Sequence, residues 1–262
     1  MGFRFRDSLI QDYRTRGCAI FRQILPPSLI RDLRRATAQA HHYAHEKRGP
    51  QAQRLQPIVN YNIDIKPFWD YAELPPLVDA ISKVLTPEHR IANSGLARTG
   101  LLLEPRDKPW CTAWHRDIRE TSNVPDLDEF RRLNRDPIWF NQINCPLYED
   151  NCTWYVPGSH LRDDLPGEID AAGTPLPPED EPCEERERAC LEYSGAMPSA
   201  ERLFMDAGDF ALYHPNGWHL GNYLPGRRRV TIHDFAPTPQ LLDWYDRWER
   251  KRSRQKKEES KT

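Results

Sequence analysis

Helical periodicity marks the N-terminal third of the chain and returns near its C-terminal end. Gly17 can end a first helix, and Pro26 can open a second one. In that second helix Leu29, Ile30 and Leu33 recur at the spacing of one helical face. The pattern therefore predicts four helices, over residues 7–16, 26–45, 75–85 and 239–250.

Between these helices the pattern changes to short β-favouring runs separated by turns rich in Gly and Pro. The predicted strands cover residues 18–21, 91–93, 97–103, 112–117, 138–147, 153–156, 210–213 and 230–235. The 24 prolines of the chain also favour strands and loops over long helices. Many short strands of this kind predict a sandwich, a barrel or a jelly roll.

Two segments lack this regular pattern. Residues 161–200 are rich in Pro, Asp and Glu, and we expect a long loop there that acts as a lid or an insertion. Residues 251–262 are charged and poor in apolar side chains, which predicts a disordered tail. We therefore expect a single domain over residues 1–250.

Composition and charge narrow the class of protein. The 37 basic and 39 acidic residues give a formal net charge of −2, so no global field points to nucleic acid or to an anionic membrane. The first 21 residues contain no apolar signal-peptide core, and no run of about eighteen apolar residues occurs. The six cysteines are scattered, which is typical of reduced thiols. We expect a cytoplasmic globular protein that binds neither membrane nor nucleic acid.

A His and an Asp stand two residues apart at His115 and Asp117. In an extended strand such positions share a face, so one nitrogen and one oxygen ligand can project together. A distal histidine would complete a two-His-one-carboxylate triad, which leaves open positions on a non-haem Fe(II). His219, in a Gly- and Pro-bearing loop after a predicted strand, is the favoured third ligand, and His214 is its nearest rival.

Three arginines, Arg227 to Arg229, lead into the last predicted strand about ten residues after His219. An arginine there could form a bidentate pair with a small dicarboxylate whose other end chelates the metal. The order of His-x-Asp, distal His and nearby Arg predicts an Fe(II) site that uses 2-oxoglutarate and O2 as cosubstrates.

Four segments together resemble the phytanoyl-CoA dioxygenase (PhyH-like) family of Fe(II)- and 2-oxoglutarate-dependent oxygenases. They are the N-terminal helix–strand–helix at residues 8–40, Trp114–Asp117, the Pro-Gly-Ser-His segment within 149–160, and Gly208–Phe235. The resemblance implies a mainly β fold with flanking helices, a double-stranded β-helix (a cupin-like jelly roll).

The resemblance also implies roles for individual residues. His115, Asp117 and His219 would be the iron ligands. Aligning the last strand with the family puts the 2-oxoglutarate anchor at Arg228, with Arg229 as the alternative, and Asn222 would add a further contact to the cosubstrate. We expect 2-oxoglutarate to be decarboxylated to succinate and CO2 while the substrate is oxidised, most simply by hydroxylation.

Some residues depart from the family pattern. Cys152 stands where the family has a Gly after the turn Asn, and Gly221 stands where it often has a small polar residue that binds 2-oxoglutarate. Asp117 is intact. Related halogenases replace that carboxylate by a small residue so that chloride can bind the iron, and halogenation is therefore disfavoured.

The substrate is less defined than the reaction. Trp110, Trp114 and Trp218 flank the predicted ligands and could wall a pocket for a small polar molecule. Arg98 and Arg119 could bind a substrate carboxylate, whereas the acidic segment 161–200 would suit a polar or cationic one. Two alternatives use the same fold: a cupin-type metal-dependent hydrolase or isomerase without 2-oxoglutarate, and a non-catalytic binding protein.

Overall fold

Ten short antiparallel strands form two sheets in the computed structural model, which describes residues 2–224 and 226–259. The larger sheet has the order β1 (Cys18–Phe21), β8 (Phe210–Tyr213), β5 (Gln142–Pro146), β10 (Val230–Asp234), β3 (Gly100–Leu103) and β2 (Arg54–Leu55). The smaller sheet has the order β4 (Trp110–Cys111), β9 (His219–Tyr223), β6 (Thr153–Tyr155) and β7 (Glu201–Arg202).

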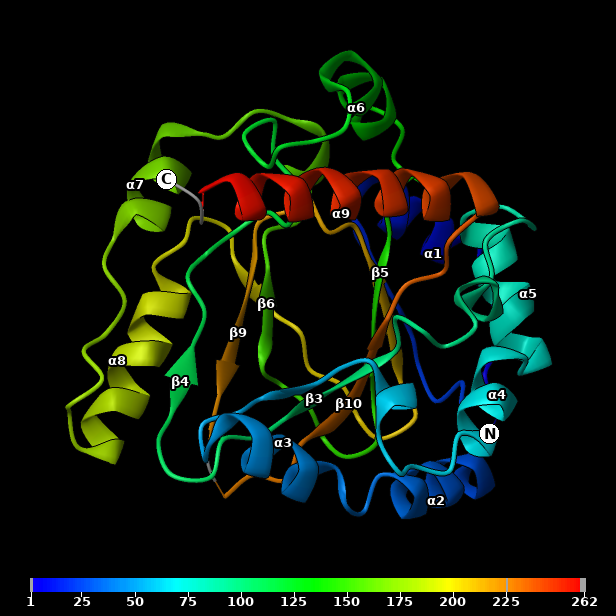
Figure 1. Cartoon of the computed structure of the whole chain (residues 1–262), viewed down its shortest axis with the longest axis horizontal. Helices are drawn as coiled ribbons and strands as arrows, with labels where there is room; N and C mark the ends of the chain where they lie inside the picture. Colours follow the sequence, from blue (N-terminus) through cyan, green and yellow to red (C-terminus); the bar gives the residue numbers. More distant parts are fainter. Residues whose placement is uncertain (1, 225, 260–262) are drawn as a thin grey trace.

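Nine α-helices surround these sheets within the described ranges, and Figure 1 shows their arrangement. They are α1 (Ser8–Gln11), α2 (Pro27–Ala36), α3 (Ala40–Arg48), α4 (Lys66–Ala72), α5 (Pro75–Val84), α6 (Leu127–Asn134), α7 (Pro166–Gly173), α8 (Cys183–Gly195) and α9 (Pro239–Glu259). A π-helix, η1 (Asp12–Arg16), continues α1, and 3-10 turns occur at η2 (Ile58–Asn60), η3 (Ile91–Ser94) and η4 (Ser159–Leu161). None of the helices in these ranges is long and apolar enough to cross a membrane.

Side chains of the larger sheet alternate between a helix-covered face and an inner face. On β10, Val230 and Ile232 join the largest apolar cluster, which also contains Phe68 of α4 and Ile81 of α5. The residue between them, Thr231, therefore points to the opposite, inner face. This alternation gives the inner face its polar residues, and the two sheets enclose them.

Two smaller apolar clusters hold the remaining helices. Trp114, Trp218 and Leu220 pack with Tyr193 of α8 on the outer side of the smaller sheet. A second cluster joins α6 to α9 through Phe130, Phe140 and Trp244. Its buried members are Ile118, Val124, Phe130, Leu133, Phe140, Phe235, Leu241, Trp244 and Trp248. Figure 1 shows α9 (red) lying across one end of the strands, with α8 on one side of the sheets and α4 and α5 on the other.

The jelly-roll prediction is confirmed, and six of the eight predicted strands form, four of them with shorter bounds. Residues 18–21 and 210–213 are strands with the predicted bounds. Residues 91–93 were predicted as a strand but belong to η3, because Gly95 in a left-handed conformation ends a tight turn there. The predicted helix over residues 26–45 is two helices, α2 and α3, separated by residues 37–39.

The segment 161–200 contains helices where we expected a long loop. Its helix α8 is rich in Glu and Arg, which are strong helix formers, but it buries few apolar side chains and so lacks a clear hydrophobic stripe. Arg186 attaches α8 to the backbone by donating to the carbonyl oxygens of Pro109 (2.7 Å) and Pro177 (3.0 Å). At the C-terminal end α9 continues to Glu259, into the predicted tail, and residues 260–262 lie outside the described residues.

Gly17 tests how tightly the N-terminal segment packs on the smaller sheet. It ends η1 with φ +77°, and a Cβ there would lie 2.6 Å from Nδ1 of His160 and closer still to the hydroxyl of Tyr155. Gly17→Ala should lower the free energy of unfolding by about 2–4 kcal/mol, from left-handed strain and overpacking together. Gly95→Ala is the control, because Gly95 is also left-handed but has open space around its Cβ position. Equal losses in the two variants, measured by urea unfolding, would rule out the packing contribution.

Candidate metal centre

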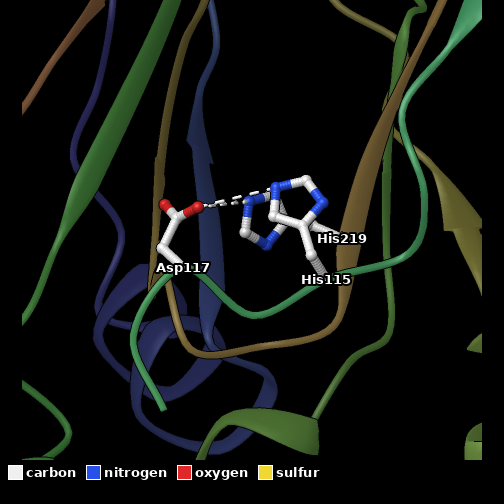
Figure 2. Close-up of side chains that lie close together, drawn as sticks. All are labelled: His115, Asp117 and His219. Atoms are coloured by element: carbon white, nitrogen blue, oxygen red, sulfur yellow. Dashed lines mark ion pairs between the residues drawn. The ribbon is translucent and has the colours of Figure 1, made fainter. Parts of the chain in front are cut away.

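His115, Asp117 and His219 converge from two separate segments of the chain. Their ligand atoms all lie within 4.8 Å of one another. The Oδ1 atom of Asp117 is 3.5 Å from Nε2 of His115 and 3.7 Å from Nε2 of His219. Figure 2 shows the carboxylate directed at both imidazole rings. The predicted triad therefore comes together in space, and within the described residues it is the group of three metal-ligating side chains that meets this distance condition.

A backbone bridge sets the separation of the two histidines. The N–H of His115 donates to the carbonyl of His219 (3.1 Å), and the N–H of His219 donates back to the carbonyl of His115 (3.0 Å). The strand predicted over residues 112–117 does not form, because regular pairing ends at Cys111 in β4, and this isolated bridge at His115 is the only strand-like pairing in that range. As a result the ring centroids of the two histidines lie 4.3 Å apart.

Hydrogen bonds to the backbone also orient both rings. Nδ1 of His115 lies 2.7 Å from the carbonyl oxygen of Ala113, and Nδ1 of His219 lies 2.8 Å from that of Gly217. A carbonyl can only accept, so each Nδ1 carries a proton, and in the neutral ring Nε2 then keeps its lone pair for a metal. Burial, together with the neighbouring His115, lowers the pKa of His219 to about 4, which keeps its ring neutral at pH 7.

The donor set fits Fe(II). Two neutral imidazoles and one carboxylate are the ligands of the facial triad of non-haem iron oxygenases, which leaves further positions open. The side chains of His115 and Asp117 remain 39% and 33% exposed, so the metal position faces open space. His115, Asp117 and His219 could hold the ion, and the remaining positions could take a bidentate cosubstrate and O2.

This open space is a chamber of about 260 Å³ between the two sheets. Its wall combines Trp110 with inward polar residues, and the full lining is Gln53, Arg54, Leu102, Trp110, Thr112, His115, Asp117, Gln142, Asn144, Thr153, Tyr213, His219, Leu220, Gly221, Tyr223 and His233. Of the three predicted tryptophans, Trp110 therefore lines the chamber. Trp114 and Trp218 instead pack in the outer cluster against α8.

The three arginines at residues 227–229 have different environments. Arg228 is exposed and lies over the ring of Tyr148, with its guanidinium carbon 5.3 Å from the ring centroid. Arg229 is buried, and its Nε donates to Oδ2 of Asp150 (2.8 Å). Strand alternation explains the difference, since Arg229 has the inward parity of Thr231. Asp150 outweighs the effect of burial and raises the pKa of Arg229, so both members of this pair are charged.

The guanidinium of Arg229 has unused hydrogen-bonding capacity. Its Nη1 is buried and has no partner among the described residues. The guanidinium carbon of Arg229 lies 4.6 Å from the ring centroid of Tyr223. Arg229 also lines a cavity of about 350 Å³, and Tyr223 lines both this cavity and the metal chamber. An unpaired buried N–H is costly, so a carboxylate that enters from the chamber side would be stabilised there. These residues therefore fit the distal end of 2-oxoglutarate.

The family departure at Gly221 also has a physical reason. A Cβ at Gly221 would lie 2.5 Å from the hydroxyl of Tyr223 and 2.7 Å from its Cζ, so the missing side chain makes room for this ring. Along β9, the side chain of Asn222 points to the opposite face of the sheet from that of Tyr223, which lines the chamber. It is buried on the outer face of β9, where its Nδ2 donates to Oγ of Ser194 (3.2 Å). Asn222 therefore lies away from the metal chamber.

The two remaining predicted residues, Arg98 and Arg119, lie on different cavities. Arg98 lines a cavity of about 490 Å³ that adjoins the metal chamber beneath α9. Arg119 lies over Trp218, 4.5 Å from the ring centroid, and faces a third cavity outside the chamber. No residue of the segment 161–200, all of it described, lines the chamber or the adjoining cavity, so its helices cover neither.

Several residues that support the site were not identified from the sequence. Asn216 accepts from the N–H of Ile118 through its Oδ1 (3.1 Å), and Ser159 accepts from the N–H of Trp218 through its Oγ (2.8 Å). Arg116 donates from Nη1 to the carbonyl of Ser159 (2.6 Å). These bonds join both ligand loops to the Pro-Gly-Ser-His segment, which explains why that motif accompanies the triad.

Comparison with known proteins agrees with this geometry. A sequence profile of the phytanoyl-CoA dioxygenase (PhyH) family matches residues 13–222. A comparison with curated protein sequences found no match to the chain. HygX from Streptomyces hygroscopicus, solved with nickel and 2-oxoglutarate bound, is 16% identical, with a TM-score of 0.59 and coverage of 90% of this chain and 88% of HygX.

Two further solved structures share the fold. SnoN, a non-haem 2-oxoglutarate-dependent epimerase from nogalamycin biosynthesis, is 14% identical, with a TM-score of 0.51 and coverage of 88% of this chain and 80% of SnoN. EvdMO1 is 15% identical, with a TM-score of 0.56 and coverage of 87% of this chain. The chain spans 49% of EvdMO1, about half its length. At these identities the likeness shows a common fold.

Removal of a single ligand should abolish tight metal binding. His219→Ala should weaken Ni(II) binding, measured by calorimetry on metal-free protein, by more than about 100-fold, because changes to groups that merely orient a ligand already cost 10–100-fold. The matched control is His42→Ala, since His42 is an exposed histidine on α3 outside the site. Unchanged Ni(II) affinity in folded His219→Ala would contradict the assignment of this site.

Proposed function

Because this chain belongs to the phytanoyl-CoA dioxygenase family, we propose that it hydroxylates a small organic substrate. The chain is a non-haem oxygenase that depends on Fe(II) and 2-oxoglutarate, which is the chemistry of this family. The observation that carries the proposal is the complete triad, with two free Nε2 atoms and an intact carboxylate at Asp117. An intact carboxylate fills the position that a halogenase leaves for chloride.

Fe(II) and 2-oxoglutarate, when bound, would supply the oxidation: 2-oxoglutarate and O2 would give succinate and CO2, with one oxygen atom passing to the substrate. The chain contributes binding and orientation. His115, Asp117 and His219, which line the chamber, would hold the metal. The aromatic and hydrogen-bonded side chains of the wall would position the reacting C–H bond.

We assign Arg229, the alternative in the sequence-based prediction, as the anchor of the distal 2-oxoglutarate carboxylate in preference to Arg228. Its inward parity, its burial and its unpartnered Nη1 support this assignment, whereas Arg228 is exposed. Asp150 keeps Arg229 in place by accepting from its Nε. Tyr223, which lines both the chamber and the arginine cavity, would place its hydroxyl beside the bound cosubstrate.

Hydroxylation is one of several outcomes that this fold supports. SnoN, with the same fold, is an epimerase. Epimerisation and hydroxylation both begin with removal of a hydrogen atom from the substrate, but only hydroxylation adds oxygen to the product. Product analysis therefore distinguishes them.

The arginine assignment can be tested with 2-oxoglutarate binding. Anaerobic protein with Fe(II) should develop a weak visible charge-transfer band on titration with 2-oxoglutarate. Arg229→Gln should raise the dissociation constant by about 10–100-fold, the loss of a hydrogen bond to a charged group, and Arg228→Gln should change it by less than about two-fold. Arg229→Lys keeps a cation beside Asp150, so it tests the bidentate contact if Arg229→Gln fails to fold. The reverse ranking would favour Arg228 as the anchor.

The reaction type can be tested by coupled turnover. Metabolite pools incubated with the Fe(II)-loaded enzyme and isotopically labelled O2 should yield succinate together with a product that carries one labelled oxygen. His219→Ala should give neither, whereas His42→Ala should behave like the wild type. Succinate release with an isomerised product that carries no label would contradict hydroxylation and leave the cosubstrate assignment intact.

A further inference from the structure

The metal chamber opens into the cavity beneath α9. Four residues line both spaces: Arg54, Asp117, Gln142 and His233. A molecule that occupies the outer cavity of about 490 Å³ can therefore reach the metal position only past these side chains within this pair of cavities. Their chemistry, together with the rest of the outer wall, limits what kind of substrate fits.

Aromatic side chains form one wall of the outer cavity. Phe235 from the end of β10 meets Tyr245 of α9 edge to face, with ring centroids 5.3 Å apart. Trp248 follows one turn later, 5.8 Å from Tyr245. Nε1 of Trp248 donates to the carbonyl of Ser122 (2.8 Å), which fixes the orientation of the indole. Such a wall suits a flat apolar body, because aromatic rings offer large, rigid contact areas.

The charges around this cavity are unequally paired. Arg98 is neutralised by two carboxylates of α9, Glu249 and Asp246, the latter at 2.8 Å. Arg54 and Arg252 also line the cavity, and neither has an ion-pair partner among the described residues. The outer cavity therefore presents two positive charges without a carboxylate partner in the described part of the chain, and one of them, Arg252, lies over the ring of Trp248 with its guanidinium carbon 4.9 Å from the centroid.

The remaining acids do not offset these cations. Asp117 belongs to the metal centre. Burial raises the pKa of Asp234 to about 7, although its carboxylate accepts a hydrogen bond from Thr99 Oγ1 (2.5 Å). This group therefore carries only part of a negative charge at neutral pH. A cationic substrate would find no free carboxylate here other than a metal ligand.

The position of Arg54 directs its charge to the junction of the two spaces. Arg54 pairs with Leu102 on the neighbouring strand, and Leu102 lines the chamber, so the side chain of Arg54 has the same inward parity. Beside it, Nε2 of Gln142 lies 3.0 Å from Nε2 of His233, and Oε1 of Gln142 is buried without a partner among the described residues. The junction thus offers a cation and an unused hydrogen-bond acceptor.

We infer that the substrate is a small organic anion, which binds its carboxylate or phosphate group to Arg54 and lays a flat apolar body against Phe235, Tyr245 and Trp248. This inference rests on the proposed function, because it places the substrate in the cavity that leads to the metal. Arg54 is then a specificity-determining residue, distinct from the cosubstrate anchor at Arg229. An anionic substrate also differs from the cationic substrate that the acidic segment 161–200 suggested.

Matched probes can test the charge preference without turnover. The protein is loaded with Ni(II), which does not support oxidation, and with 2-oxoglutarate, and binding is followed by calorimetry. The probes are 3-phenylpropanoate, 3-phenylpropanamide and 3-phenylpropylamine, which share one body and differ in charge, together with 2-phenylethyl phosphate. At least one of the two anions should bind on the order of ten-fold more tightly than the amide, as expected for a partly exposed charge-assisted pair. The tighter of the two anions identifies the carboxylate or the phosphate.

Variants separate the role of Arg54 from a general effect of charge. Arg54→Gln should abolish the preference for the anion, and Arg54→Glu should reverse it in favour of the amine. Arg31→Gln is the control, since Arg31 is an exposed arginine of α2 that does not line the metal chamber, the cavity beside Arg229 or the outer cavity beneath α9. Near-UV circular dichroism of each variant confirms that the fold is retained.

Several outcomes would overturn the inference. They are equal binding of acid, phosphate and amide by the wild type, preference for the amine, failure of every probe to bind at millimolar concentration, and a preference that survives Arg54→Gln. Loss of 2-oxoglutarate binding in Arg54→Gln would also overturn it, because Arg54 would then anchor the cosubstrate. Failure of the wild type to bind Ni(II) and 2-oxoglutarate would instead contradict the proposed function itself.

Discussion

The reciprocal backbone pair between His115 and His219 is the constraint on which the metal centre depends. It joins two segments that are about a hundred residues apart and brings their imidazoles side by side before any metal binds. Since the carbonyls of Ala113 and Gly217 hold the Nδ1 atoms, rotation of either ring would break a hydrogen bond, and the bond of His219 is buried. The site is therefore preorganised by the backbone, and Asp117 completes it from the same extended segment.

Strand parity governs the rest of the interior. The parity that places Thr231 and His233 on the inner face of β10 also places Arg229 there and turns Arg228 outward. A buried guanidinium without a partner would cost several kcal/mol, and Asp150 offsets this cost through one nitrogen only. The remaining nitrogens are then available to a ligand, so a single ion pair both retains the charge in the core and leaves it able to bind.

Local signals predicted much of the fold and of the metal site, and they failed where long-range contacts decide. The strand at residues 210–213 and the helix at 75–85 were predictable because alternation and capping are local properties. The choice between Arg228 and Arg229 needed the register of β10, which depends on its pairing with β3 and β5. Helix α8 was missed because it lacks a regular apolar stripe: Cys190 and Tyr193 contact the outer cluster, and Arg186 bonds to backbone carbonyls.

Charge composition illustrates the same limit at the substrate cavity. The acidic segment 161–200 suggested a negatively charged lid, yet none of its residues lines the chamber or the cavity beneath α9. Two of its carboxylates also pair with arginines, Asp164 with Arg116 at 2.7 Å and Glu168 with Arg162 at 2.5 Å. Paired charges contribute little field at the metal chamber, and salt screens most of the segment's other carboxylates because they are exposed to solvent. The unpaired charge between the metal chamber and the outer cavity is that of Arg54 on β2, a two-residue strand that the sequence pattern gave little reason to predict. What a site attracts is thus set by the few charges that folding leaves without partners.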